Sequence, residues 1–292
     1  MLALRVDPRA DEGWFYEGAG IYRHVYLSTA QTVHVAPHGI YVPAVVDPTT
    51  IKRTPAATGH ANVTIQTELE GFAEYVPPNG GGGSLVYAVV STIVNPAGHV
   101  VWSDAVNSSL PAHGAPNSIV VTQHASLQDA LLWETPPQAP TPPAPPAPPT
   151  APTAPTAPTA PTAPTASAAM YTLVTKVLRG SPGSVVDMVN TSFGIRHLDF
   201  DPQKGLLLNG KATKAKGMCN HQDFAAVGVA VPDRLQTFRV DTMKTYGVNA
   251  WRMSHNPPNK ELLDALDTAG FLVMNENRNF GNHSTWLADF VR

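Results

Sequence analysis

Apolar and polar residues alternate along much of the first 200 residues. Residues 62–69 (NVTIQTEL) place an apolar side chain at every second position, which is typical of a strand with one buried face. Clusters of glycine, proline and asparagine separate such runs and predict turns, and short strands at this spacing favour a β-sandwich. The predicted strands are Leu2–Val6, Tyr22–Leu27, Thr32–Val35, Ile40–Val46, Asn62–Leu69, Leu85–Val94, Val100–Trp102, Ser118–His124, Tyr171–Leu178 and Ser184–Asn190.

The pattern changes from Gly205 onward. Apolar residues recur at helical spacing in Val231–Tyr246 and again in Asn259–Ala269, where Pro232 suits a first helical turn and Gly270 suits a helix end. Strands alternating with helices predict the start of a parallel α/β domain. The predicted strands are Val248–Met253, Phe271–Met274 and a hairpin of Leu206–Leu208 and Lys211–Lys216 around the turn Asn209-Gly210.

A proline-rich segment interrupts the β-rich part. Residues 136–165 hold fourteen of the 29 prolines and contain no charged, aromatic or large aliphatic residue. Such a segment buries too little apolar surface to offset the entropy of ordering it, so we expect an extended and disordered insert between two strands. An inert spacer is the favoured interpretation. A ligand for a proline-recognition domain and an O-glycosylated stalk are the alternatives.

Composition excludes several classes of protein. The 19 lysines and arginines stand against 22 aspartates and glutamates, and the net charge of −3 argues against a basic nucleic-acid-binding protein. The single cysteine, Cys219, has no partner for a disulfide within the chain. No apolar run approaches the roughly 20 residues of a membrane span, and residues 1–10 lack a secretory leader's apolar stretch. We therefore expect no nucleic-acid partner and no membrane, and the compartment stays open.

Three longer stretches carry distinctive motifs. They are Glu12–Leu27 (EGWFYEGAGIYRHVYL), Phe193–Asp223 (FGIRHLDFDPQKGLLLNGKATKAKGMCNHQD) and Asn249–Asn277 (NAWRMSHNPPNKELLDALDTAGFLVMNEN). These stretches resemble glycoside hydrolase family 2, and specifically its β-galactosidase members. The resemblance covers nearly the whole chain outside the proline-rich segment.

The resemblance implies a fold in three parts. Residues 1–28 resemble the end of the family's jelly-roll sugar-binding domain, and residues 29–200 resemble its immunoglobulin-like sandwich. Residues 205–292 resemble the start of its (β/α)₈ barrel, but a complete barrel takes about 250 residues and this segment has 88. We therefore expect a mainly β chain, in which an immunoglobulin-like β-sandwich with a disordered insert at 136–165 precedes an incomplete barrel.

The family's chemistry requires two carboxylates. A retaining glycosidase holds them about 5–5.5 Å apart, one as the acid and one as the nucleophile. The resemblance implies that both follow later barrel strands, so we expect both to be missing and the chain alone to be inactive. Glu276 is a weak candidate for a catalytic acid, because the family's acid also follows an asparagine. However, residues 271–278 (FLVMNENR) resemble the third barrel strand, with Asn275 in place of the family's usual aspartate.

Other polar residues follow the predicted barrel strands, where the active sites of such barrels form. The resemblance implies that His221 and His255 hydrogen-bond sugar hydroxyls, since a neutral imidazole offers one donor and one acceptor. It also implies that Arg252 orients and stabilises the carboxylate nucleophile. No cofactor is expected, and the histidines and carboxylates lack the spacing of known zinc sites. The predicted substrate-binding residues are His221, Asp223, Arg252, His255 and Asn256.

These observations lead to one main hypothesis and two alternatives. The main hypothesis is a chain derived from a glycoside hydrolase of β-galactosidase type, which hydrolyses terminal β-D-galactosides. The first alternative is a non-catalytic β-sandwich scaffold or a residual carbohydrate-binding module. The second is a wall-associated or interaction protein in which the proline-rich segment is the functional part. The sequence leaves the sugar open among galactosides, glucuronides and mannosides, and it leaves the oligomeric state open as well.

Deleting residues 136–165 tests whether the insert packs against the sandwich. We expect the free energy of unfolding to change by less than about 1 kcal/mol, because the closure entropy of a flexible loop varies slowly with its length. Thermal or urea unfolding of the two forms measures the change. A loss of more than about 2 kcal/mol would contradict the spacer interpretation, since a solvated loop cannot contribute that much.

Overall fold

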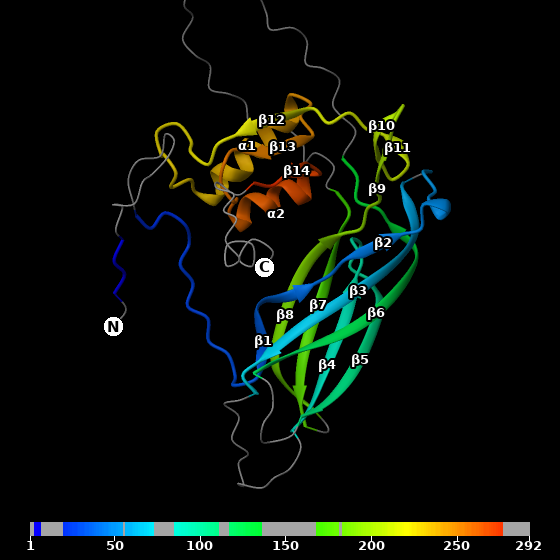
Figure 1. Ribbon diagram of the computed structural model, residues 1–292, viewed down its shortest axis with the longest axis vertical. Helices are drawn as coiled ribbons and strands as arrows, with labels where there is room; N and C mark the ends of the chain where they lie inside the picture. Colours follow the sequence, from blue (N-terminus) through cyan, green and yellow to red (C-terminus); the bar gives the residue numbers. More distant parts are fainter. Residues whose placement is uncertain are drawn as a thin grey trace, which may run out of the picture.

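The computed structural model contains a β-rich part and a smaller α/β part (Figure 1). The proline-rich segment at 136–165 lies outside the described residues, as do the first part of the stretch Glu12–Leu27 and the residues after Glu276. Within the described ranges, neither helix is long and apolar enough to cross a membrane. The described residues are 3–6, 20–54, 56–72, 85–110, 117–135, 168–180 and 183–276.

The first sheet is built around strand β3 (Thr58–Glu70). One edge of β3 pairs antiparallel with β6 (Ser118–Leu131). The other edge pairs with β2 (Ala44–Val46) and, further along, with β1 (His34–Tyr41). A short 3₁₀ helix, η1 (Pro48–Thr50), connects β2 to β3. The clearest polar–apolar alternation of the sequence therefore belongs to the central strand of this sheet.

The second sheet is also antiparallel and has the strand order β5-β4-β7-β8. The chain leaves the first sheet after β6 and enters the second in β7, so residues 136–165 lie between strands of different sheets. The two flanks of this connection meet, because the backbone N–H of Leu131 donates to the Tyr171 hydroxyl at 2.8 Å. The strands of the second sheet are β4 (Leu85–Val94), β5 (Val100–Leu110), β7 (Met170–Arg179) and β8 (Ser184–Gly194).

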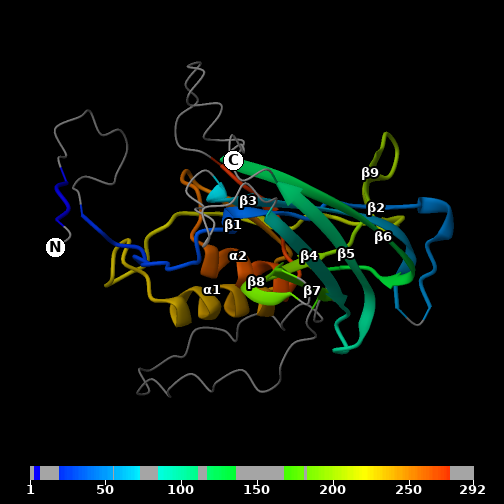
Figure 2. The same cartoon turned by 90° about the horizontal axis from the view of Figure 1, so that it is seen from below.

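The two sheets face each other and enclose the main core (Figures 1 and 2). Val63 and Ile65 of β3 pack in the same cluster as Ile93 of β4 and Leu173 of β7, and all four are at most 1% exposed. Burying one such side chain contributes roughly 1.5–3 kcal/mol relative to leaving it in water. The strand alternation of the sequence thus builds a two-layer β-sandwich.

A small antiparallel sheet follows the sandwich. Its strands are β9 (Leu198–Asp201), β10 (Gly205–Leu208) and β11 (Lys211–Ala212). The hairpin between β10 and β11 is the predicted one, and its turn residues Asn209 and Gly210 both have positive φ, at 50° and 76°. Asparagine followed by glycine tolerates this conformation best, which explains the signal in the sequence. Strand β9 was not predicted.

The described residues from Gly217 onward form the expected strand–helix–strand–helix–strand order, although the first strand of this order was not among the predicted strands. Strands β12 (Gly217–Asn220), β13 (Ala250–Met253) and β14 (Leu272–Met274) are parallel and adjacent in this order. Helices α1 (Asp233–Thr245) and α2 (Lys260–Ala269) connect them and lie side by side (Figure 1). We call residues 217–276 the barrel segment.

A separate core joins the helices of the barrel segment to its sheet. Trp251 of β13 and Phe271 at the start of β14 meet edge to face, with ring centroids 6.3 Å apart. Val240 of α1 and Leu266 of α2 pack against them, and all four are at most 1% exposed. Aromatic pairs of this geometry add to the stabilisation that burial provides. The barrel segment therefore has its own apolar centre.

Trp133 joins the sandwich to the barrel segment. Its backbone N–H donates to the Ile195 carbonyl at 2.7 Å, and its own carbonyl accepts from Asn209 Nδ2 at 2.9 Å. Its indole Nε1 donates to the carbonyl of Asp267 in α2 at 2.8 Å. The Arg196 guanidinium stacks on the indole at 4.8 Å from the ring centroid. One buried residue thus links the end of the sandwich, the small sheet and α2.

Two predicted strands are wrong. Tyr22–Leu27 is extended but pairs with no described strand, and the described part of Leu2–Val6 is not a strand either. A strand needs the free backbone groups of a neighbouring strand, whereas Tyr22–Leu27 lies against loops and helix starts of the barrel segment and contacts them through its side chains. Alternation alone cannot distinguish these two situations.

Substituting Trp133 tests its role at the junction. We expect Trp133→Ala to reduce the free energy of unfolding by about 3–5 kcal/mol, since a large buried side chain is lost. Trp133→Phe should cost less, about 1–3 kcal/mol, because a smaller aromatic ring still fills part of the site while the hydrogen bond to Asp267 is lost. Urea unfolding measures both values. Trp102→Phe, at a half-buried site on β5, is the matched control, and an equal effect of the control would contradict the special role of Trp133.

Candidate functional site

Parallel strands bring several polar residues to one edge of the barrel segment. The carboxyl ends of β12, β13 and β14 meet there, and the register places Cys219 beside Arg252. His221 follows β12 directly, His255 follows β13, and Glu276 follows β14. Residues that are remote in sequence therefore become neighbours because the strands are parallel and in register.

Glu276 connects Arg252 and His255. Arg252 Nε lies 2.5 Å from Glu276 Oε1, and His255 Nδ1 lies 2.8 Å from Glu276 Oε2. The Glu276 side chain is only 20% exposed, so these charge-assisted contacts are partly shielded from water. Each carboxylate oxygen therefore contacts a nitrogen of Arg252 or His255. The geometry favours an orienting role for Glu276 over the role of a catalytic acid.

The rings of His221 and His255 pack against each other. Their centroids are 5.6 Å apart, and the rings are nearly perpendicular at 86°. Arg239 holds the backbone of the loop that contains His221, because its Nη2 donates to the His221 carbonyl at 2.8 Å. Arg239 lies on the buried side of α1, where its guanidinium is 5.4 Å from the centroid of the Trp251 ring. The sequence analysis missed Arg239, although its place one turn after Gln236 could have indicated a polar inner face.

The other two predicted residues lie beside this cluster. Asp223 is exposed and comes two residues after His221. Asn256 directly follows His255, and its Nδ2 atom is buried and has no hydrogen-bond partner among the described residues. Such a donor is costly to leave unpaired, so Asn256 is suited to receive an additional acceptor. The structure thus brings Arg252, His255 and Glu276 into direct contact, with Asn256 adjacent in the chain.

Cys219 is a further member of the cluster that the sequence analysis did not assign. Arg252 Nη1 lies 3.3 Å from its Sγ, and the thiol is exposed. The hydrogen bond from Arg252 and a weaker contribution from Ser254 lower the pKa of Cys219, because both stabilise the thiolate. The signal was present in the sequence: Cys219 and His221 are two positions apart, and residues at this spacing share a face of a strand.

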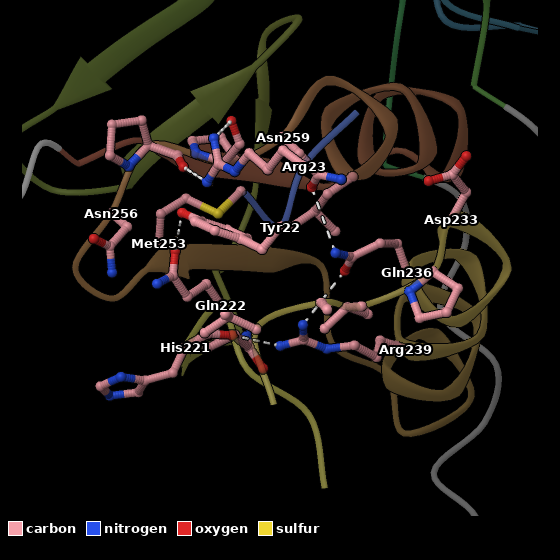
Figure 3. Close-up of a pocket in the computed structure, with 18 of the residues that line it drawn as sticks. Tyr22, Arg23, His221, Gln222, Asp233, Gln236, Arg239, Met253, Asn256 and Asn259 are labelled. Carbon is pink, nitrogen blue, oxygen red and sulfur yellow. Dashed lines mark hydrogen bonds between the residues drawn. The ribbon is translucent and has the colours of Figure 1, made fainter. Parts of the chain in front are cut away.

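A pocket of about 330 Å³ lies next to the cluster (Figure 3). Its walls come from both helix starts, the loops after β12 and β13, and residues Ile21–His24. These four residues begin an extended segment, Ile21–Leu27, which we call the strap. Arg239, Gln236 and Asn259 form a connected network at one side, with Arg239 Nη1 3.4 Å from Gln236 Oε1. Among the predicted residues, His221 and Asn256 line this pocket, whereas the contacts of Glu276 lie outside it.

A different group has the geometry of a metal site. Among the described residues, His24, Asp233 and Glu261 offer ligand atoms within 4.8 Å of one another, whereas the predicted histidines and carboxylates do not converge in this way. All three already take part in hydrogen bonds, and both carboxylates lie in the first turn of a helix. The positive end of the helix dipole favours anions there and opposes a cation. These residues are better explained as an anchor for the strap.

A known family model matches the part of the chain that contains the barrel segment. Residues 202–288 match the family model described as "Glycosyl hydrolases family 2, TIM barrel domain". This stretch includes every predicted site residue. The match agrees with the parallel α/β order of the described residues.

One known protein resembles the whole chain, and another resembles about a third of it. The "Beta-galactosidase BoGH2A" of Bacteroides ovatus is 30% identical over 296 residues, which cover 100% of this chain and 28% of that protein. A "Beta-glucuronidase" of Bacteroides fragilis is 37% identical over 94 residues, which cover 32% of this chain and 14% of that protein. The chain therefore spans less than a third of the length of these relatives.

A solved structure also resembles this chain. The crystal structure of a glycosyl hydrolase family 2 member from Bacteroides cellulosilyticus superposes with a TM-score of 0.67 at 25% identity. The superposition covers 90% of this chain and 29% of that one. The sandwich and the barrel segment thus recur together in a larger protein.

Alkylation of Cys219 measures its contact with Arg252. We expect the rate of reaction with iodoacetamide to rise with pH at a midpoint below that of an ordinary thiol, because only the thiolate reacts and Arg252 lowers its pKa. Arg252→Gln should move the midpoint upward, and Arg252→Lys should move it less because the charge remains. The exposed Arg234→Gln is the control. Since the chain has one cysteine, the reaction reports on this site alone.

Equal midpoints for the parent chain and for Arg252→Gln would contradict the contact between Arg252 and Cys219. A midpoint that also moves in Arg234→Gln would show that net charge, rather than this contact, sets the reactivity of the thiol.

Proposed function

Because the chain belongs to glycosyl hydrolase family 2, we propose that it forms part of the sugar site of a β-galactosidase-type enzyme that hydrolyses terminal β-galactosides. The observation that supports this proposal is the cluster of Arg252, Glu276 and His255 at the carboxyl ends of parallel strands, with His221 packed beside it. Active sites of (β/α)₈ barrels form at this edge of the strands. The position of this cluster supports the proposed sugar-binding role of the predicted residues.

In this proposal His221 and His255 bind hydroxyl groups of the sugar. His255 uses Nδ1 toward Glu276. Its Nε2 is then the acceptor of the neutral ring and can receive a sugar hydroxyl, provided that Nδ1 carries the proton. The contact between the rings of His221 and His255 fixes the direction of both imidazoles. Asn256 adds an amide donor next to them.

Arg252 has the role of orienting the carboxylate nucleophile. A guanidinium carries five N–H donors in a rigid plane. Glu276 and Cys219 engage its Nε and Nη1, so other N–H groups remain for a second carboxylate. Glu276 acts in this scheme as a positioning residue, since it fixes Arg252 and His255 at the same time. A planar and pre-oriented cation stabilises a developing charge without reorganisation during the reaction.

We also propose the domain organisation that the sequence indicated. Residues 1–28 are the end of a jelly-roll sugar-binding domain, and residues 29–200 are an immunoglobulin-like sandwich. Residues 136–165 are a disordered spacer within that sandwich. Residues 205–292 are the start of the catalytic barrel. The parallel sheet of the barrel segment and the two-layer packing of the sandwich support this division.

Binding of isopropyl β-D-thiogalactoside, a galactoside that is not hydrolysed, tests the sugar site. We expect binding to weaken about tenfold in His221→Ala and in His255→Ala, the effect of losing one hydrogen bond worth about 1.4 kcal/mol. NMR titration of the full chain measures the affinity. His124→Ala, an exposed histidine on β6, is the matched control. A phenyl β-D-glucuronide serves as the competing sugar, and its preference over the galactoside would contradict the assignment of the substrate.

Turnover of a chromogenic β-galactoside gives the second measurement. We expect none from this chain alone, because retaining catalysis needs two carboxylates about 5–5.5 Å apart and the carboxylate of Glu276 faces Arg252 and His255 instead. Turnover that Glu276→Gln abolishes would make Glu276 catalytic. Absence of both binding and turnover would favour the non-catalytic scaffold.

A further inference from the structure

The strap is attached to the barrel segment through polar side chains. Arg23 Nη2 donates to the Pro257 carbonyl at 2.5 Å, and its Nη1 lies 3.4 Å from the Pro258 carbonyl. The Tyr22 hydroxyl lies 3.4 Å from Gln222 Oε1. Burial of apolar surface contributes little toward the end of the strap, since Leu27 is 93% exposed. Specific hydrogen bonds therefore determine where the strap lies.

Two of these contacts end next to the candidate sugar site. Gln222 directly follows His221 on the loop after β12, and Pro257 comes two residues after His255 on the loop after β13. Figure 3 shows Tyr22 and Arg23 from the strap between these two loops. Neither loop has regular secondary structure at these positions, and side-chain contacts from the strap are among the interactions that hold it. The strap thus contacts the loop of His221 and the loop of His255, and the rings of these two histidines pack against each other.

The next residues of the strap attach it to the helix starts. His24 Nε2 lies 2.8 Å from Asp233 Oδ1 at the start of α1. The Tyr26 hydroxyl donates to Glu261 Oε1 at 3.1 Å in the first turn of α2. The rings of His24 and Tyr26 are neighbours, with centroids 5.8 Å apart. The strap therefore contacts both helices as well as both loops.

We propose that Tyr22 and Arg23 are positioning residues for the candidate site and that the contact of His24 with Asp233 makes the docking of the strap depend on pH. The proposed function enters only in naming the site that is positioned, because the docking itself involves no sugar. Arg23 holds the loop of His255, Tyr22 holds the loop of His221, and His24 fastens the strap to α1.

The charges around His24 determine the sign of the pH effect. The hydrogen bond to Asp233 and the charge of that residue raise the pKa of His24, and Glu261 on α2 adds to this. Lys260 also lies at the start of α2, but it pairs with Asp264. Because the pKa is raised in the docked state, the contact strengthens docking below the ordinary histidine pKa. That contribution is lost as the pH rises through the raised pKa.

Trypsin cleavage after Arg23 measures docking in the full chain. The docked guanidinium is bound to Pro257 and cannot enter the protease, so cleavage requires release of the strap. The rate is divided at each pH by that of a free peptide of residues 18–28. We expect the corrected rate to rise about two- to fivefold between about pH 6 and pH 8, the effect of losing one exposed ion pair.

Asp233→Asn is the matched variant, because it removes the carboxylate and leaves the cleaved sequence unchanged. We expect its corrected rate to be high and nearly independent of pH. A parent chain whose corrected rate stays constant with pH, or an Asp233→Asn chain with the same dependence as the parent, would overturn the pH-dependent contact. A corrected rate equal to that of the free peptide at every pH would overturn docking itself.

NMR of the His221 and His255 rings measures positioning. The perpendicular pair produces a ring-current shift, which disappears when the two loops separate. We expect Arg23→Gln and Tyr22→Phe to reduce this shift, and Arg23→Lys to restore part of it, while the unfolding temperature stays unchanged. An unchanged shift in both Arg23→Gln and Tyr22→Phe would overturn the proposal. Neither measurement uses a sugar, so a failure to bind galactosides would affect the proposed function alone.

Discussion

The attachment of the barrel segment to the sandwich depends on the buried indole of Trp133. The parallel sheet of the barrel segment has only three strands, and its outer strands β12 and β14 leave Met218 and Met274 exposed. Trp133 attaches this segment to the sandwich, because the residue is 2% exposed and its Nε1 donates to the carbonyl of Asp267 at the end of α2.

The parallel register of β12, β13 and β14 determines which residues meet at the candidate site. Cys219 and Arg252 are register partners, and Glu276 follows the strand that pairs with β13 on its other side. Shifting β14 by one residue would turn its side chains to the opposite face. Glu276 would then lose Arg252 and His255 together. The polar cluster therefore depends on the apolar core of Trp251 and Phe271, which sets the register of these strands.

The sequence predicted the parts of this structure that local patterns encode. Alternation located β3, and the Asn209-Gly210 dipeptide located the hairpin turn, because each signal reflects a local backbone requirement. The resemblance located Arg252 and His255, and the structure brings both to Glu276. Patterns could not place the strap, since its position depends on groups that are remote in the sequence. Tyr22–Leu27 reads as a strand, yet its partners are side chains and loop carbonyls.

The loops of His221 and His255 are thus held from two sides by polar groups. On one side Glu276 orders His255, and on the other Arg239 and the strap hold the backbone around both histidines. Apolar packing fixes the strands beneath these loops but does not extend to the imidazoles. Hydrogen bonds are directional, whereas apolar contacts tolerate rotation. A site that must present ring nitrogens at defined angles therefore gains its precision from such contacts, and it depends on the protonation state of the groups that make them.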